Sequence, residues 1–162
     1  MTSTSTDLLR PDAALVRLPR RRTPQRQPAP VPGAPGLFTV DATWGAIQPH
    51  ELPGGVRTVG ELEVLDHLRA GGLAIDTRQP DQLASGTLPG AIAIRHQEIV
   101  DRLPGDAHGP IVLFCNGPQC AATPQAVAAL LAAGHAPDRL RYYRGGIHDW
   151  VTLGLPLTTE RS

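Results

Sequence analysis

From Val56 onward, short apolar runs alternate with stretches in which apolar residues recur at helical spacing. Each run is bounded by Gly, Pro or charged residues, which is typical of buried strands. Apolar strands that alternate with helices predict a mostly parallel sheet covered by helices on both faces. The four predicted strands are Leu73 to Ile75, Ala91 to Ile94, Ile111 to Phe114 and Leu140 to Tyr143.

Two helices are predicted between these strands. Thr58 followed by Glu61 fits a capping box at the start of the first helix, which Gly71-Gly72 ends. Its apolar face is marked by Leu62, Leu65 and Leu68. The second helix is predicted from about Pro124 to Ala133, with Thr123 as N-cap, Pro124 at the first helical position and Gly134 after the end.

Residues 1–40 differ in composition from the rest of the chain. They contain seven prolines, six of the fifteen arginines and only two of the fifteen acidic residues. Such a segment cannot bury enough apolar surface to offset its ordering entropy. We therefore predict a disordered tail over 1–40, either solvated or in contact with a protein partner, and one folded domain over 41–162.

The charge of the remaining chain limits the choice of partners. Of fifteen arginines and fifteen acidic residues, nine and thirteen lie beyond residue 40, and this mildly acidic domain argues against a nucleic-acid surface. No apolar run approaches the ~18 residues that span a bilayer. The first ten residues lack the pattern of a secretory signal. We expect a cytoplasmic protein with no membrane or nucleic-acid partner.

The segment with the most chemical content is Cys115-Asn116-Gly117-Pro118-Gln119-Cys120, which holds both cysteines of the chain. Cys115 directly follows a predicted buried strand, and a helix begins a few residues later. Backbone N–H groups and a helix N-terminus favour an anion, and the thiolate is the reactive form of cysteine. From spacing alone, a reactive thiol and a pair of buried or disulfide-bonded cysteines are equally good interpretations.

The placement of other polar residues favours the reactive interpretation. Asp76, Cys115 and Arg144 each fall just past the end of a predicted strand. In parallel sheets, ligands bind beyond the carboxyl ends of the strands. No spacing of His, Cys, Asp or Glu indicates a metal site, and we expect no cofactor.

Four motifs follow one another between residues 75 and 156. They are Ile75-Asp76-Thr77-Arg78, Ser85 to Ala91, Val112-Leu113-Phe114-Cys115, and Tyr143 to Trp150 followed by Gly154-Leu155-Pro156. With these motifs, the stretch from about Val56 to Leu157 resembles a single rhodanese (sulfurtransferase) domain. The resemblance implies a five-stranded, mostly parallel sheet with helices on both faces.

The resemblance also implies a reaction. Cys115 would accept a sulfane sulfur from a small donor (thiosulfate or a low-molecular-weight persulfide), hold it as a persulfide, and pass it to a thiol or a cyanide-like acceptor. Pro118 has no N–H, so the expected persulfide-binding residues are the others of the loop: Asn116, Gly117, Gln119, Cys120 and Ala121. The expected rim or supporting residues are Asp76, Arg78, Arg144 and His148.

The loop departs from the family in its charge. Rhodanese loops often carry Arg or Lys, whereas residues 116–122 carry no charge. Positive charge for thiosulfate would have to come from Arg78, Arg144 or His148. The uncharged loop keeps open a non-catalytic binding or regulatory module, and Cys115 with Cys120 keeps open a thiol redox sensor. Asp76 and Arg78 are expected to pair with each other.

The second cysteine has three interpretations. Cys120 either attacks a persulfide on Cys115, or resolves an oxidised Cys115, or is a small residue at the helix start with no redox role.

Overall fold

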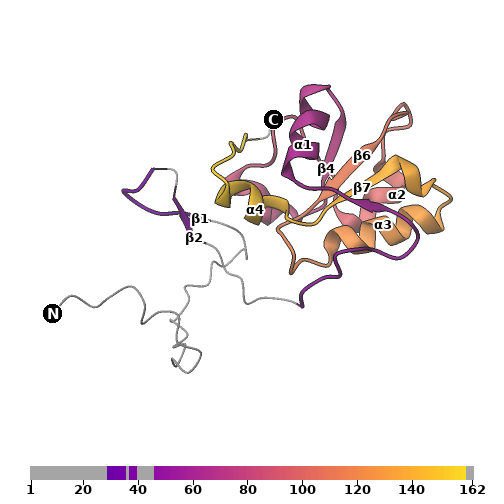
Figure 1. Cartoon of the computed structure of the whole chain (residues 1–162), viewed down its shortest axis with the longest axis horizontal. Coiled ribbons are helices and arrows are strands. Elements are labelled where there is room, and N and C mark those ends of the chain that lie inside the picture. The colour runs from indigo at the N-terminus through magenta and orange to yellow at the C-terminus, as the bar shows by residue number, and fades with distance from the viewer. Residues whose placement is uncertain (1–28, 36, 40–45, 160–162) are drawn as a thin grey trace, which may run out of the picture.

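The computed structural model describes residues 29–35, 37–39 and 46–159, and the sheet at its centre lies between two layers of helices (Figure 1). Its five strands are all parallel, in the order β3-β7-β6-β4-β5. The predicted fold class, a five-stranded parallel sheet with helices on both faces, is therefore confirmed. The strands are β3 (Arg57–Thr58), β4 (Leu73–Asp76), β5 (Ile92–Ala93), β6 (Ile111–Phe114) and β7 (Leu140–Tyr143).

Four α-helices and three short 3-10 helices connect these strands in the described domain. The α-helices are α1 (Glu61–Arg69), α2 (Ile99–Arg102), α3 (Ala122–Ala132) and α4 (Gly146–Thr152). The 3-10 helices are η2 (Pro80–Ser85), η3 (His96–Glu98) and η4 (Pro137–Arg139).

Strand alternation divides the core into two clusters, one on each face of the sheet. In β6, Ile111 and Leu113 pack with Leu130 of α3, whereas Val112 and Phe114 belong to the cluster of α1 and α4. Successive side chains of a strand point to opposite faces, so the four residues of β6 pack against both layers of helices. All four are buried, which explains why this strand reads as an unbroken apolar run.

The predicted strands are found in place, but the details of the helix starts were wrong. Thr58 lies in β3 and donates its hydroxyl to the carbonyl of His50, so it cannot form a capping box. The N-cap of α1 is Gly60, and the buried residue of this helix is Val64, while Leu62 is exposed. α3 begins at Ala122, which places Thr123 inside the first turn rather than at the N-cap.

Two short strands lie within the segment predicted to be a disordered tail. β1 (Ala29–Pro30) pairs with β2 (Phe38–Thr39) in an antiparallel arrangement. Backbone hydrogen bonds from Ala34 to Val31 and from Leu37 to Ala34 form the turn between them. Residues 1–28 and the proposed domain boundary near residue 40 lie outside the described residues, so these predictions stay predictions.

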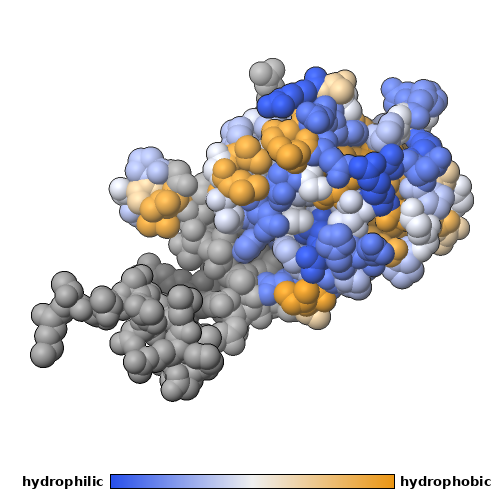
Figure 2. Space-filling view, in the orientation of Figure 1, coloured by the Kyte–Doolittle hydropathy of each residue, from blue (hydrophilic) through white to orange (hydrophobic). Residues whose placement is uncertain are grey.

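The visible surface of the domain is mixed in character. On the face shown in Figure 2, hydrophobic side chains form separate spots between hydrophilic ones. Among the described residues, no helix has both the length and the apolar character that crossing a bilayer requires.

The segment after β6 is fixed against the start of α4. The N–H groups of Ile147 and His148 donate to the carbonyls of Cys115 and Asn116, at 3.0 and 2.7 Å. Gly146 makes this approach possible because it has φ of +57° and no side chain. A Cβ there would collide with the carbonyl oxygen of Cys115 and lie 2.9 Å from the nitrogen of Gly117.

Gly146→Ala should therefore destabilise the domain through both backbone strain and a steric clash. We expect a loss of roughly 2–4 kcal/mol in the free energy of unfolding by urea denaturation. Gly154→Ala is the matched control, since Gly154 has φ of +74° with nothing near its Cβ position, and should lose only about 1 kcal/mol. Equal losses for the two variants would contradict the close approach.

Candidate active site

Cys115 lies at the carboxyl end of the central strand β6 and is almost completely buried, with 2% of its surface exposed. Continuing the alternation of Ile111 and Leu113, its side chain points to the face of the sheet that α3 covers. The strand thus directs the sulfur toward the N-terminus of an 11-residue helix. The positive end of a helix dipole stabilises negative charge at that point.

Thr123, in the first turn of α3, makes the contact with this sulfur. Its hydroxyl and its backbone N–H both act on the thiol of Cys115 by lowering its pKa, against the larger effect of burial. The hydroxyls of Thr77 and Thr123 lie 2.9 Å apart, and either one can donate to the other, while Thr77 Oγ1 also lies 3.0 Å from the carbonyl oxygen of Phe114. Thr77 and Thr123 are fully buried and connect the ends of β4 and β6 to α3 beneath the cysteine.

Cys120 returns to the same point through a tight turn. Its N–H donates to the carbonyl of Gly117 at 3.0 Å, and Pro118 occupies the second position of the turn, where its fixed φ is favourable. The thiol of Cys115 donates to the carbonyl oxygen of Cys120 at 3.5 Å, and each thiol shifts the pKa of the other. Both cysteines are free thiols.

The pKa values of the two thiols are shifted in opposite directions. Burial, followed by the hydrogen bond to Cys120, raises the pKa of Cys115 well above its ordinary value. The pKa of Cys120 is lowered, first by the hydrogen bond from Cys115 and then by the N–H groups of Ala122 and Asn116. Since the thiols titrate together, the pair loses its first proton readily, from Cys120, and its second with difficulty.

The rest of the predicted loop is held mostly through its backbone. The carbonyl of Pro118 accepts from the N–H of Gln48 at 2.7 Å, and the Cβ position of Gly117 would clash with the side chain of His148. Ala121 precedes α3 as its N-cap, and its carbonyl accepts from the N–H of Gln125. Gln119 is half-buried.

Two buried polar groups lie near the cysteines without a hydrogen-bond partner among the described residues. They are the side-chain amide of Asn116 and the hydroxyl of Tyr142. Tyr142 pairs with Leu113 in the sheet and shares its face. Burial and the charge of Cys115 both raise the pKa of this hydroxyl, so it stays protonated and can donate.

Asp76 and Arg78 form a closed ion pair, as expected from the sequence. Both side chains are completely buried, and Arg78 Nη2 lies 2.7 Å from Asp76 Oδ2. Arg78 also donates to the carbonyls of Gln82 and Gly86, and the hydroxyl of Thr87 donates to Asp76. By strand alternation, Asp76 shares the face of Ala74, the face opposite to Cys115. The pair supports the end of β4.

Arg144 and His148 are also engaged. Arg144 donates through Nε and Nη2 to the carbonyl of Gln48, at 3.0 and 2.7 Å. His148 Nδ1 lies 3.0 Å from Asp149 Oδ1. The structure therefore commits Arg144 Nε and Nη2 and His148 Nδ1 to partners other than the cysteine loop.

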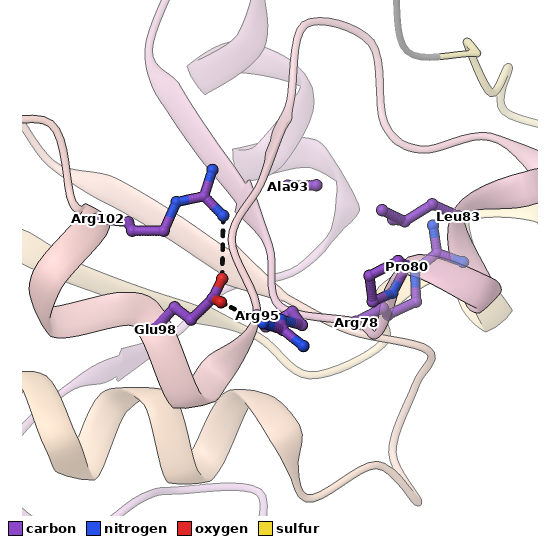
Figure 3. A pocket seen from close by; sticks show the side chains of 7 residues that line it. All are labelled: Arg78, Pro80, Leu83, Ala93, Arg95, Glu98 and Arg102. Atoms are coloured by element: carbon purple, nitrogen blue, oxygen red, sulfur yellow. Dashed lines mark hydrogen bonds and ion pairs between the residues drawn. The ribbon is translucent and has the colours of Figure 1, made fainter.

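A separate pocket of about 300 Å³ lies at the β5 edge of the sheet (Figure 3). There Glu98 accepts from both Arg95 and Arg102, and these hydrogen bonds lower the pKa of Glu98 to about 2. Neither cysteine lines this pocket. Among the described residues, no group of three or more His, Cys, Asp or Glu side chains could hold a metal ion.

Sequence reasoning missed the roles of Thr77 and Thr123 in contacting the cysteine. The available indication was that Thr123 lies at the start of a helix directly after the cysteine loop. We interpreted it as a cap for its own helix, whereas its hydroxyl is shared between Cys115 and Thr77.

The fold and the loop agree with the comparison to known families. The model of the rhodanese-like domain matches residues 61–153, and the chain belongs to this family. A similar curated protein is the HTH-type transcriptional regulator Rv0324 of Mycobacterium tuberculosis, which is 35% identical over 99 residues. That match covers 59% of this chain and 42% of the relative, so the chain spans less than half of the relative's length.

Solved structures share the fold. A thiosulfate sulfurtransferase from Pseudomonas aeruginosa superposes with a TM-score of 0.53 at 24% identity, covering 66% of this chain and 21% of that one. The human single-domain sulfurtransferase TSTD1 gives a TM-score of 0.50 at 24% identity, covering 60% of this chain and 97% of that one. A protein from Lactobacillus plantarum gives 0.54 at 24% identity, covering 62% and 86%.

Arg78→Met should strongly destabilise the domain, because it leaves the carboxylate of Asp76 buried without its cation. We expect a loss of about 3–5 kcal/mol in the free energy of unfolding by urea denaturation. The matched control is Arg95→Met, which removes an exposed ion pair and should lose far less. A stable Arg78→Met protein would contradict the structural role of this arginine.

Removing either thiol should shift the pKa of the other in a defined direction. In Cys115→Ala, Cys120 loses its hydrogen-bond donor, so its pKa rises toward the ordinary cysteine value. In Cys120→Ala, Cys115 loses the neighbour that disfavours its thiolate, so its pKa falls. Thiolate absorbance followed against pH measures both shifts, and two thiols that titrate independently would contradict the contact.

Proposed function

We propose that this chain is a sulfurtransferase in which Cys115 accepts a sulfane sulfur and carries it as a persulfide. The observation that supports this most strongly is the position of its sulfur at the end of β6, facing the hydroxyl and N–H of Thr123 in the first turn of α3. Hydrogen-bond donors fixed in advance stabilise an anion that forms during a reaction, most strongly where water is excluded. The family of the chain and the sulfurtransferases among its structural neighbours also support the proposal.

The first step uses both cysteines. The thiolate of Cys120 takes the proton of Cys115, and the Cys115 thiolate attacks the outer sulfur of a persulfide RS–SH. The bond between the two donor sulfurs breaks, and RS⁻ leaves with its electron pair. The donor thiolate then takes the proton of the new persulfide, which leaves RSH, a Cys115 persulfide anion and a neutral Cys120. The hydroxyl of Tyr142, which is buried without a hydrogen-bond partner among the described residues and whose pKa responds to the charge of Cys115, is an uncharged donor for this anion.

The electrostatics of the site favour a weakly charged donor over dianionic thiosulfate. Residues 116–122 carry no charge, and the guanidinium groups of Arg78 and Arg144 are bound to protein acceptors. One missing charge-assisted hydrogen bond costs about 1.5–3 kcal/mol, which is tenfold or more in rate. We therefore assign a low-molecular-weight persulfide as the donor, and a thiol or a cyanide-like molecule as the acceptor.

A rapid-quench experiment with two donors tests the proposal. Wild type, Cys120→Ser and Cys115→Ser are mixed with glutathione persulfide or thiosulfate, and peptide mass spectrometry locates any added sulfur. We expect one sulfur on Cys115 in wild type and Cys120→Ser, none at this position in Cys115→Ser, and loading at least about ten times faster from the persulfide.

Melting temperatures of the three proteins serve as the folding control. If folded wild type and folded Cys120→Ser take no sulfur on residue 115 from either donor, the sulfurtransferase proposal is wrong.

The burial of Cys115 and the regulator among the relatives favour a second candidate, a rhodanese-fold regulatory module. In that case neither donor would turn over, and residues 1–40 would provide the contact with a protein partner. A pull-down that compares the full chain with a chain that starts at Phe38 would test this contact, and equal recovery of a partner by the two chains would contradict it. A cytoplasmic location and the lack of a nucleic-acid partner on the domain rest on composition alone.

A further inference from the structure

We propose that Cys120 is a resolving thiol that discharges the Cys115 persulfide as hydrogen sulfide and leaves a Cys115–Cys120 disulfide. This inference rests on the proposed function, since it needs sulfur to reach Cys115 first. It adds a second activity to the domain, the reduction of a persulfide to sulfide without a separate acceptor.

The geometry of the loop brings the two sulfurs together. The turn closed by the Cys120 N–H and the Gly117 carbonyl reverses the chain within four residues. As a result the Cys115 thiol donates to the Cys120 carbonyl oxygen at 3.5 Å, both thiols are free and buried, and each shifts the pKa of the other. A nucleophile held against its target reacts as if present at very high concentration.

The surroundings of Cys120 favour its thiolate, which is the nucleophilic form of cysteine. Its sulfur accepts from the N–H groups of Ala122 and Asn116, and both bonds favour the thiolate. A purely structural small residue at this position would gain nothing from donors that stabilise a negative charge. The lowered pKa of this thiol therefore agrees with the contact geometry and with a role in thiol exchange.

The discharge step balances without an outside oxidant. The proton of Cys120 moves to the outer sulfur of the Cys115 persulfide anion, and the Cys120 thiolate attacks the inner sulfur. A bond forms between the two cysteine sulfurs, the bond between the inner and outer sulfur breaks, and the outer sulfur leaves as HS⁻ with the electron pair. The sulfane sulfur is reduced, and the two cysteines are oxidised to the disulfide.

Regeneration of the two free thiols requires a reductant, and a low-molecular-weight thiol can serve. Two equivalents of a low-molecular-weight thiol R′SH reduce the disulfide, which restores Cys115 and Cys120 and yields R′SSR′. Burial keeps both sulfurs from bulk solvent, with exposed fractions of 2% and 6%. This exclusion of solvent favours the internal attack over exchange with small thiols before the sulfur is discharged.

The test is a single-turnover experiment without added reductant. Wild type, Cys120→Ser and Cys120→Ala are treated with glutathione persulfide for as long as each needs to take up one sulfur, which is longer in the variants because they lack the proton acceptor of the loading step. Each protein is then freed of excess donor and followed for sulfide release, free thiols and the mass of the 115–120 peptide. We expect wild type to release one sulfide per chain and to lose two thiols. Both Cys120 variants should keep the added sulfur on Cys115, with sulfide release at least about a hundredfold slower.

The outcomes separate this inference from the function on which it rests. If the variants load and wild type holds its persulfide as long as they do, the resolving role is overturned and the sulfurtransferase remains. Sulfide release from the variants at the wild-type rate would overturn it in the same way. If neither wild type nor the variants load, the sulfurtransferase is wrong, and the resolving role is overturned with it.

Discussion

The hydrogen bonds from the first turn of α3 to the sulfur of Cys115 connect the fold to its chemistry. They exist because β6 directs Cys115 to one face of the sheet and because the loop returns the chain to that face within a few residues. Gly146 and the N–H groups after it hold the loop from the other side. If the first turn of α3 or the segment at Gly146 moved, the sulfur would lose the donors that offset the free-energy cost of a buried anion.

The site stabilises negative charge by hydrogen-bond donors and a helix dipole, and the arginines near it serve the structure. Arg78 pairs with Asp76 and donates to two carbonyl groups, and Arg144 donates to the carbonyl of Gln48. A dithiol held by N–H groups suits neutral or singly charged sulfur donors better than dianions. In the proposed reaction the neighbouring thiol Cys120, whose pKa is lowered, is the proton acceptor for Cys115.

Much of the fold could be predicted because its central strands are short, apolar and buried on both faces. The pairing of Asp76 with Arg78 was also predictable, since the residues are neighbours in the chain. The helix starts were not, because the hydroxyls of Thr58 and Thr123 have long-range partners that outcompete local capping. The contact of Arg144 with Gln48 joins residues 96 positions apart, and no local pattern indicates it. The acidity of Cys120 likewise depends on a turn whose closure only the folded loop reveals.

The most direct test of the account is a crystal structure of Cys120→Ser after treatment with glutathione persulfide. The account predicts one additional sulfur atom bonded to Cys115 Sγ, with the hydroxyl and N–H of Thr123 still directed at the modified side chain. An unmodified Cys115 in a fully folded, donor-treated crystal would contradict it.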